Sequence, residues 1–242
     1  MKKKLFKLFL LKSYLVSPNN LHLIFKGNSI NFLSGQFITL HLVDFEGKKH
    51  FRNYSIANSP NKKNIIELSI SRIKNGFATS ILFNLKKGDI LYASGPIGKF
   101  LLKHEKRIKR YILLATGTGV ATYRSMLDSI AKLIIRFNIK FILIMGCRKK
   151  TDCIYYNDFL KFQKQYNNFK YFTYFSRETK LSNLFENKGY IQNSFSSIKF
   201  DRKSDIIFLC GNPVMIDESI TLLKKFNFDN QSIKKEKYIV LK

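Results

Sequence analysis

Residues 111–127, YILLATGTGVATYRSML, decide the fold of this chain. The stretch opens with an apolar run at 111–115, short enough for a buried strand, and the sequence TGTG at 116–119 interrupts it. From Val120 onward the apolar residues follow helical spacing. A strand, a glycine turn and a helix in this order gather free backbone N–H groups and the positive end of a helix dipole in one place, which suits a phosphate group.

This stretch alone leaves two readings open, an ordinary turn of an α/β protein or a dinucleotide site. The Rossmann fingerprint has a third small residue where Thr122 stands and an acidic residue about 20 residues further on, and this chain departs from both. The next apolar run, 141–145, ends in the basic sequence GCRKK at 146–150. If a dinucleotide binds, cations there favour its phosphorylated form, NADP.

Composition limits the possible functions. The chain has 242 residues, 45% of them hydrophobic, which is enough for one large domain or two modest ones. Its formal net charge of +27 raises the question of a nucleic-acid partner. However, Lys, Asn, Ile and Phe are abundant along the whole chain and the basic residues form no separate arm. We therefore expect no nucleic-acid partner, and a positive field that steers an acidic protein partner.

Cysteines, histidines and the apolar N-terminus carry no further site. Cys147, Cys153 and Cys210 lack the spacing of a disulfide framework or a zinc site, and the four histidines are scattered, so we expect no metal and a reducing, cytoplasmic location. Lys7 and Lys12 interrupt the first apolar stretch, which favours a strand over a secretory signal. Since no run of 18 apolar residues exists, no transmembrane helix is expected.

The order of elements predicts two domains. Up to residue 103 the pattern predicts one short helix at 78–85 and strands at 5–15, 21–25, 36–43, 50–57, 65–72 and 90–93. Short strands at this spacing are typical of an antiparallel β-barrel. From residue 104 to 242, helices at 122–137, 156–166 and 213–226 alternate with strands at 111–115, 140–145, 169–175 and 205–210. This alternation predicts an α/β domain with a parallel sheet.

Unusual residues stand at four of these strand ends, where ligands of such sheets bind. They are the sequences GTG at 117–119, GCR at 146–148, SR at 176–177 and CGNP at 210–213. A hydroxyl beside a guanidinium, as in the SR pair, suits a phosphate monoester. Four strand ends that agree predict a nucleotide site far better than one.

The ordered motifs resemble the ferredoxin–NADP reductase family, and the bacterial ferredoxin (flavodoxin)–NADP reductases in particular. The barrel half carries RNYSIA at 52–57 and GFAT at 76–79, and the second half carries the four strand-end motifs. The ending from Glu236 to Lys242 also matches the bacterial type. The resemblance covers nearly the whole chain. It implies an FAD-binding barrel at 1–103 and an NADP-binding α/β domain at 104–242, with a C-terminal tail at the flavin.

The resemblance also implies the residues of the FAD site. They are Arg52, Asn53, Tyr54, Ser55, Gly76, Phe77, Ala78 and Thr79. Arg52 would pair with the FAD pyrophosphate, which suits a guanidinium, and Tyr54 would pack on the isoalloxazine. The short helix that begins at Gly76 would take the other pyrophosphate oxygens at its N-terminus.

For the NADP(H) site, the resemblance implies residues of the second half. They are Thr116, Gly117, Thr118, Gly119, Arg148, Ser176, Arg177, Cys210 and Gly211. Arg148, Ser176 and Arg177 would select the 2′-phosphate of NADP. Without the resemblance, each arginine reads equally as a solvated surface charge.

Three residues are implied to shape the reaction centre and its proton supply: Ser55 near flavin N5, Cys210 facing the nicotinamide, and Glu236. Without the resemblance, Cys210 reads as a small buried apolar residue. Tyr238 either stacks on the flavin or belongs to a plain final strand at 238–241, and the sequence leaves both open.

Two departures from the family pattern bear on cofactor choice. Thr122 replaces a proline of the glycine motif, and a threonine can cap the following helix. Gly189 and Tyr190 stand where the family has Gly-Arg, so Lys188 or Lys180 would have to supply the second cation, and Tyr190 could stack on the adenine. The choice between NADP and NAD stays open.

The expected activity is therefore that of a monomeric ferredoxin–NADP(+) reductase, an FAD-dependent oxidoreductase that transfers electrons between NADP(H) and ferredoxin or flavodoxin. An NAD(P)H-dependent flavin reductase and an oxygenase-type electron-transfer reductase share these two domains. A basic RNA-binding protein with decayed redox motifs is a further alternative from another class.

Overall fold

The computed structural model describes residues 5–28, 30–60 and 63–238, which form two compact units. The first unit contains the described residues up to Leu101 together with Ala121–Met126. The second contains Leu102–Val120 and the described residues from Leu127 onward. The short segment Ala121–Met126 therefore belongs with the first unit, although the chain on both sides of it belongs to the second.

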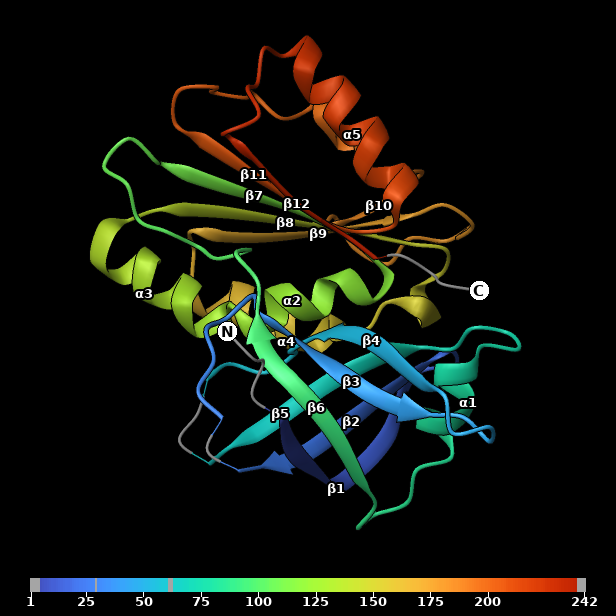
Figure 1. Cartoon of the computed structure of the whole chain (residues 1–242). Helices are drawn as coiled ribbons and strands as arrows, with labels where there is room; N and C mark the ends of the chain where they lie inside the picture. Colours follow the sequence, from blue (N-terminus) through green and yellow to red (C-terminus); the bar gives the residue numbers. More distant parts are fainter. Residues whose placement is uncertain (1–4, 29, 61–62, 239–242) are drawn as a thin grey trace. The chain divides into compact units, whose positions relative to one another are not determined.

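The first unit is an antiparallel barrel (Figure 1). Its strands are β1 (Leu5–Ser17), β2 (Asn20–Gly27), β3 (Phe37–Val43), β4 (Lys49–Ser55), β5 (Ile65–Ser71) and β6 (Ile90–Ile97). They follow the order β4-β3-β6-β1-β2-β5, and an antiparallel bridge between Ile56 and Leu68 joins the end of β4 to β5. The predicted barrel is confirmed.

Alternation along the strands fills the barrel with apolar side chains. On β5, for example, Ile66, Leu68 and Ile70 are buried, because successive side chains of a strand point to opposite faces. Helix α1 (Phe77–Phe83) adds Leu82 and Ala78 to the same core. The core thereby fixes β4 and α1, the two elements that carry the predicted FAD motifs.

The second unit is an α/β domain with one parallel sheet. The strands are β7 (Arg110–Thr116), β8 (Lys140–Cys147), β9 (Phe169–Phe175), β10 (Glu186–Lys188), β11 (Asp205–Gly211) and β12 (Ile233–Lys237). They follow the order β10-β9-β8-β7-β11-β12. The helices are α3 (Leu127–Phe137), α4 (Tyr156–Gln165) and α5 (Pro213–Lys225), with the short 3-10 turns η1 (Gly117–Gly119), η2 (Lys150–Asp152) and η3 (Ile191–Ser196). The predicted parallel sheet is confirmed.

Helices cover both faces of this sheet, α5 on one side and α3 and α4 on the other (Figure 1). Strand β7 runs through the middle and is buried on both faces, which explains its unbroken apolar sequence. Ile112 and Leu114 pack in the core under α5, whereas Tyr111 stacks on Phe141 at 5.1 Å between ring centroids. None of the helices in the described ranges has the length and apolar run that spanning a bilayer requires.

One predicted helix differs from the structure. The single helix expected at 122–137 is two helices, α2 (Val120–Ser125) and α3, because the N–H of Met126 bonds to the carbonyl of Tyr123 in a tighter turn at 3.0 Å. The two pieces pack in different units, and Thr122 lies inside α2 and does not cap it.

Of the strand considered at 238–241, only Tyr238 lies within the described residues. Strand β12 ends at Lys237, and Tyr238 follows it, half-buried, with its N–H bonded to the carbonyl of Gly211 at 2.8 Å. Residues 239–242 lie outside the described residues. Strand β10 was not predicted, because three residues are too few to show a period of two.

A partly buried ionic cluster attaches α2 to the barrel strands. Glu67 on β5 accepts from Arg124 of α2 at 2.6 Å, and its same oxygen lies 3.2 Å from Nε2 of His22 on β2. Arg124 also donates to the carbonyl of Ala57 at 2.9 Å. Burial alone would raise the pKa of Glu67, but the hydrogen bond with His22 and the charge of Arg124 hold that pKa below its ordinary value.

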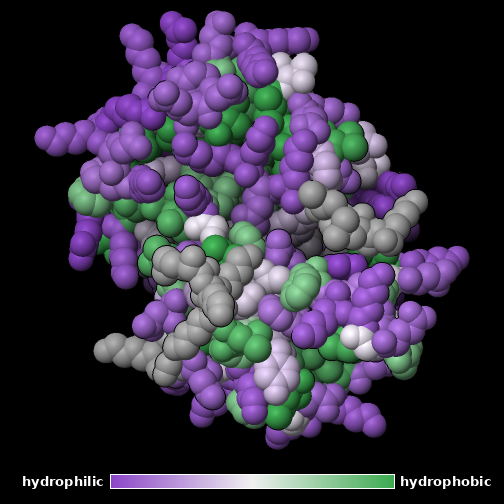
Figure 2. Space-filling model, viewed as in Figure 1, coloured by the Kyte–Doolittle hydropathy of each residue, from purple (hydrophilic) through white to green (hydrophobic). Residues whose placement is uncertain are grey.

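The surface is strongly hydrophilic. Figure 2 shows hydrophilic residues over most of the visible face, with hydrophobic residues in separate patches. Large apolar side chains that are exposed include Phe45 and Leu184, which lie in different units.

We expect the Glu67→Gln variant to lose about 2 kcal/mol of unfolding free energy at pH 7, because the charge-assisted bonds to Arg124 and His22 are lost. Since folding lowers the pKa of Glu67, the stabilisation is present above the unfolded-state pKa and is lost as pH falls through the folded-state value. Urea unfolding of both proteins from pH 7 to pH 3 should show the difference shrinking toward acid. The exposed Glu46→Gln is the matched control, and an equal loss at every pH would contradict this assignment.

Candidate active site

In the barrel, β4 presents the first group of predicted residues. His50, Arg52 and Tyr54 alternate along one half-buried face, whereas Asn53 lies on the opposite, exposed face. The amide oxygen of Asn53 accepts from the Thr39 hydroxyl at 2.8 Å. Arg52 and Tyr54 are thus placed side by side toward the same region, and Asn53 is not.

Arg52 and Tyr54 offer a cation and an aromatic surface next to each other. The Arg52 guanidinium donates to the carbonyl of Phe51 at 3.0 Å, which holds it at the strand. Burial raises the pKa of Tyr54 to about 12, with the nearby charge of Arg52 opposing the shift, so the phenol is neutral at pH 7. Ser55 ends the strand and is buried. A cation beside a flat, neutral aromatic ring fits a flavin nucleotide.

Helix α1 lies next to this strand, since the Phe77 ring is 4.4 Å from the His50 ring. Gly76 is the N-terminal cap, and its extended backbone leaves the first N–H groups of the helix without partners inside the helix. The hydroxyl of Thr79 donates to the carbonyl of Gly76 at 3.0 Å, so Thr79 shapes the turn from within, and Ala78 is buried. The structure therefore brings the two barrel motifs together.

In the α/β unit, the glycine turn after β7 packs against the turn after β11. A Cβ atom on Gly119 would lie 2.3 Å from the carbonyl oxygen of Cys210, and one on Gly211 would lie 2.5 Å from the carbonyl oxygen of Thr116. Such distances exclude any side chain. By contrast, a Cβ on Gly117 would meet open space, so this exposed glycine leaves backbone accessible at the end of the sheet. Thr118 is half-buried beside it.

The ends of β11 and β12 hold the remaining predicted residues of the reaction centre. Cys210 pairs with Glu236 in the parallel register, and Tyr238 follows directly. Cys210 is fully buried, while Glu236 and Tyr238 are half-buried. The N–H of Asn212 donates to the Thr116 hydroxyl at 3.0 Å, which ties this corner to the glycine turn.

Arg148, Ser176 and Arg177 meet at the ends of β8 and β9. The N–H of Ser176 donates to the carbonyl of Cys147 at 3.0 Å, and the N–H of Arg177 donates to the carbonyl of Arg148 at 2.8 Å. Both arginine side chains are exposed. The backbone bonds keep the two guanidinium groups on adjoining segments, as a site for a phosphate group needs.

Strand β10 and the turn after it carry two further candidates for the dinucleotide site, Lys188 and Tyr190. Lys188 pairs with Phe175 at the end of β9, and Tyr190 follows Gly189 with 69% of its surface exposed. A cation and an exposed aromatic ring therefore stand at the same sheet edge as Arg177. Lys180 is exposed in the loop between β9 and β10.

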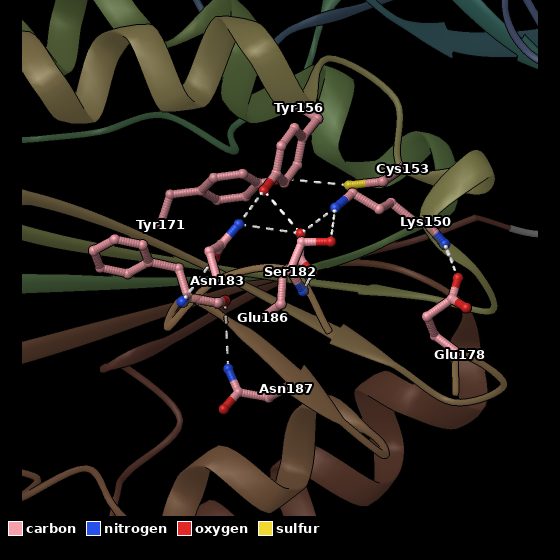
Figure 3. Close-up of polar contacts among 10 residues, drawn as sticks. Lys150, Cys153, Tyr156, Tyr171, Glu178, Ser182, Asn183, Glu186 and Asn187 are labelled. Carbon is pink, nitrogen blue, oxygen red and sulfur yellow. Dashed lines mark hydrogen bonds and ion pairs between the residues drawn. The ribbon is translucent and has the colours of Figure 1, made fainter. Parts of the chain in front are cut away.

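Sequence reasoning missed the network that holds these loops, which Figure 3 shows. Its centre is the buried carboxylate of Glu186, which pairs with the ammonium group of Lys150 at 2.7 Å. Tyr156 donates to the same carboxylate at 3.1 Å, Asn183 at 3.2 Å, and the N–H of Ser182 at 2.7 Å. All four partners converge on one buried charge.

This network connects the segment of Arg148 with the loop of Arg177. Lys150 lies in η2, two residues after Arg148, and its N–H donates to the Glu178 carboxylate at 3.1 Å. Burial would raise the pKa of Glu186, but the bond from Lys150 holds it below its ordinary value, and the same bond raises the pKa of Lys150. In the sequence, Lys150 is part of a basic run that reads as solvated. The signal available was an acidic residue, Glu186, nine positions after Arg177.

In the described part of the chain, the candidate site is not a metal site. Within the described ranges, no three His, Cys, Asp or Glu side chains gather in a group that could hold a metal ion. The arrangement instead offers cations, an exposed glycine backbone and aromatic rings, which are the groups that bind nucleotides.

The fold, the barrel residues and the strand-end residues of the α/β unit together indicate the class of protein. A sequence profile described as an oxidoreductase FAD-binding domain matches residues 10–101, and one described as an oxidoreductase NAD-binding domain matches residues 113–220. The chain is an FAD-dependent oxidoreductase with a second domain for a nicotinamide dinucleotide, so the expected FAD and NAD(P)-type cofactors are confirmed.

The relatives give the family. The flavodoxin/ferredoxin–NADP reductase of Buchnera aphidicola subsp. Schizaphis graminum is 33% identical over 89% of this chain and 88% of its own length. This chain belongs to the ferredoxin (flavodoxin)–NADP reductase family, as its motifs indicate. The phenol hydroxylase P5 protein of Acinetobacter pittii is 29% identical over 87% of this chain, which spans 58% of that protein.

Among solved structures, the fold matches a ferredoxin NADP+ reductase from Neisseria gonorrhoeae with bound FAD and NADP. The TM-score is 0.84 at 19% identity, over 98% of this chain and 99% of the other. The two-domain architecture is therefore preserved over the full length of that reductase.

We expect Gly119→Ala to lower the unfolding free energy by about 2 kcal/mol or more, because its Cβ would collide with the carbonyl of Cys210. Gly117→Ala is the matched control in the same turn. Its Cβ meets open space, and only the positive φ of 55° opposes it, at a cost of about 1 kcal/mol. Urea unfolding compares the two, and equal losses would contradict the close packing of these turns.

Proposed function

We propose that the protein is a ferredoxin–NADP(+) reductase that transfers electrons between NADP(H) and ferredoxin or flavodoxin. One observation carries the NADP(H) part of the proposal. The backbone bonds between the ends of β8 and β9 hold Arg148 and Arg177 together at the sheet edge that also bears the glycine turn. We assign the FAD-binding domain to residues 1–103 and the NADP-binding domain to 104–242.

For FAD, the barrel residues have distinct proposed roles. Arg52 pairs with the pyrophosphate, because a guanidinium forms two parallel bonds to such an anion. Tyr54 packs against the ring system as a neutral aromatic surface. Gly76 and the first N–H groups of α1 take the remaining phosphate oxygens, with Phe77, Ala78 and Thr79 setting their direction. Asn53 keeps β4 paired with β3 through Thr39.

For NADP(H), the roles follow the order of the strand ends. The backbone around Gly117 and Thr118 lines the dinucleotide, and the tight contact of Gly119 and Gly211 keeps this turn in place. Arg148, Ser176 and Arg177 bind the 2′-phosphate, which an unphosphorylated dinucleotide lacks. Lys188 supplies a further point charge and Tyr190 an aromatic surface for the adenine.

A bound flavin can accept two electrons from a nicotinamide and release them one at a time, and the protein supplies orientation and proton positions. Ser55 places a hydroxyl at the end of β4, and Glu236 places a half-buried carboxylate beside Cys210. We assign proton supply to these two oxygen groups. Cys210 packs at the nicotinamide side, and Tyr238 offers its ring to the flavin.

The electron carrier is proposed from charge. With a formal net charge of +27, the protein attracts an acidic partner over long distance, and the attraction weakens as salt screens it. Acidic ferredoxins and flavodoxins fit this field. We propose that the reductase acts as a monomer in the cytoplasm.

An oxygenase-type electron-transfer reductase is the second candidate. The similarity to the phenol hydroxylase P5 protein favours it, although this chain spans only 58% of that protein. The two candidates share the FAD and dinucleotide chemistry and differ in the protein that receives the electrons.

To test the dinucleotide site, the yellow holoprotein is reduced anaerobically with NADPH or NADH while the flavin bands are followed. We expect faster bleaching with NADPH in the wild type. Arg177→Gln should raise the Kd for NADPH on the order of tenfold and leave that for NADH unchanged, because one charge-assisted bond to the 2′-phosphate is lost.

Lys170→Gln is the control for net charge, since Lys170 is an exposed cation near the start of β9, away from the strand end. It should leave both Kd values unchanged. Equal bleaching by the two dinucleotides in the wild type would contradict 2′-phosphate recognition. Colourless protein that takes up no FAD would contradict the reductase and favour the flavin-reductase or RNA-binding alternatives.

A further inference from the structure

Two cysteines that the proposed reaction does not use lie at the base of the Arg148 segment. Cys147 is the last residue of β8, and Cys153 follows the 3-10 turn η2. The N–H of Cys153 donates to the carbonyl of Lys150 at 3.1 Å, so the turn reverses the chain and returns Cys153 to the strand. Five residues separate the two cysteines in the sequence.

Side-chain contacts place Cys153 against the face of β8 that carries Cys147. The Cys153 sulfur is 3.6 Å from the sulfur of Met145, and residues 145 and 147 share one face because they are two apart on a strand. The two thiols also interact, and this interaction raises the pKa of Cys147 and lowers the pKa of Cys153. The Tyr171 hydroxyl lies 3.3 Å from the Cys153 sulfur, the contact that Figure 3 draws.

We propose that Cys147 and Cys153 are a peroxide-sensitive dithiol that forms an intramolecular disulfide across the turn carrying Arg148. The thiolate of Cys153 attacks one oxygen of hydrogen peroxide, the O–O bond breaks, and the leaving hydroxide takes a proton to become water. The Cys147 sulfur then attacks the sulfenic acid of Cys153, the S–S bond forms, and the S–O bond breaks. The second oxygen leaves as water with the Cys147 proton, so two thiols and one peroxide give one disulfide and two waters.

The surroundings assign the two roles. The hydrogen bond from Cys147, supported by the Tyr171 hydroxyl against the effect of burial, holds the pKa of the Cys153 thiol below its ordinary value. Cys147 is less buried and stands ready as the second thiol. Cys210 lies on another strand, is fully buried, and has no place in this pair.

A disulfide here would act on the proposed 2′-phosphate site, and this consequence rests on the proposed function. An S–S bond, about 2.05 Å long, would tie Cys153, which follows η2, to the last residue of β8. The closed loop contains Arg148, whose carbonyl accepts from Arg177, and Lys150, whose ammonium group holds Glu186. We expect oxidation to weaken binding of a 2′-phosphate.

The test uses the full-length holoprotein, reduced and then treated with a small excess of hydrogen peroxide. Intact mass should fall by two hydrogens. Trypsin cuts after the three basic residues at 148–150, so the peptides of Cys147 and Cys153 stay together only if a disulfide joins them. Cys153→Ser should abolish the linked peptides, and Cys147→Ser should leave a sulfenic acid on Cys153 that dimedone traps.

Cys210→Ser is the matched control and should still form the linked peptides. Wild-type protein that gains oxygen atoms without linked peptides, or that links Cys210 instead, would overturn the disulfide. Circular dichroism of each variant excludes misfolding as the cause of a negative result.

A second measurement tests whether the disulfide weakens phosphate binding, separately from whether the disulfide forms. Calorimetry with adenosine 2′-phosphate should show at least a threefold higher Kd for the disulfide form, reversed by dithiothreitol. Equal Kd values for the two forms would overturn the coupling to Arg148. If the reduced protein does not bind this probe at all, the proposed 2′-phosphate site fails, and the peptide map still decides the disulfide.

Discussion

The α/β unit depends on one close backbone contact, between the turn that follows β7 and the turn that follows β11. Gly119 lies against the carbonyl of Cys210, and Gly211 lies against the carbonyl of Thr116, in gaps that hold no side chain. This contact brings the ends of two neighbouring parallel strands together and leaves Gly117 exposed above them. The conformational freedom of glycine is used here to expose backbone at the place where ligands of parallel sheets bind.

In the α/β unit, a buried carboxylate holds the loops, and the arginines of those loops are exposed. Glu186 is a carboxylate with four partners, and its pair with Lys150 ties the segment of Arg148 to the loop that follows β9. The Glu186 carboxylate is buried while Lys150 is half-exposed, so removing Lys150 would leave a buried charge uncompensated. The exposed arginines can therefore bind a phosphate group while buried groups hold their backbone.

The sequence predicted the fold class, the strands with clear apolar runs and the family, because each of these depends on patterns of several residues. It did not predict the break at Met126, since helical periodicity continues through it while the two halves pack in different units. It also missed Glu186, because a buried carboxylate depends on partners more than 20 positions away, such as Lys150. Cys147 and Cys153 looked unrelated because only the turn η2 brings them together. The roles of the site residues stay predictions.

The central claim is that electrons from NADPH pass through bound FAD to a one-electron protein carrier. The most direct measurement is anaerobic stopped-flow spectroscopy of the holoprotein with NADPH and either ferredoxin or flavodoxin, with free flavin as a rival acceptor. We expect a protein carrier to be reduced catalytically and faster than free flavin, and we expect this rate to fall as salt screens the basic surface. Reduction of free flavin with no transfer to either carrier would contradict it.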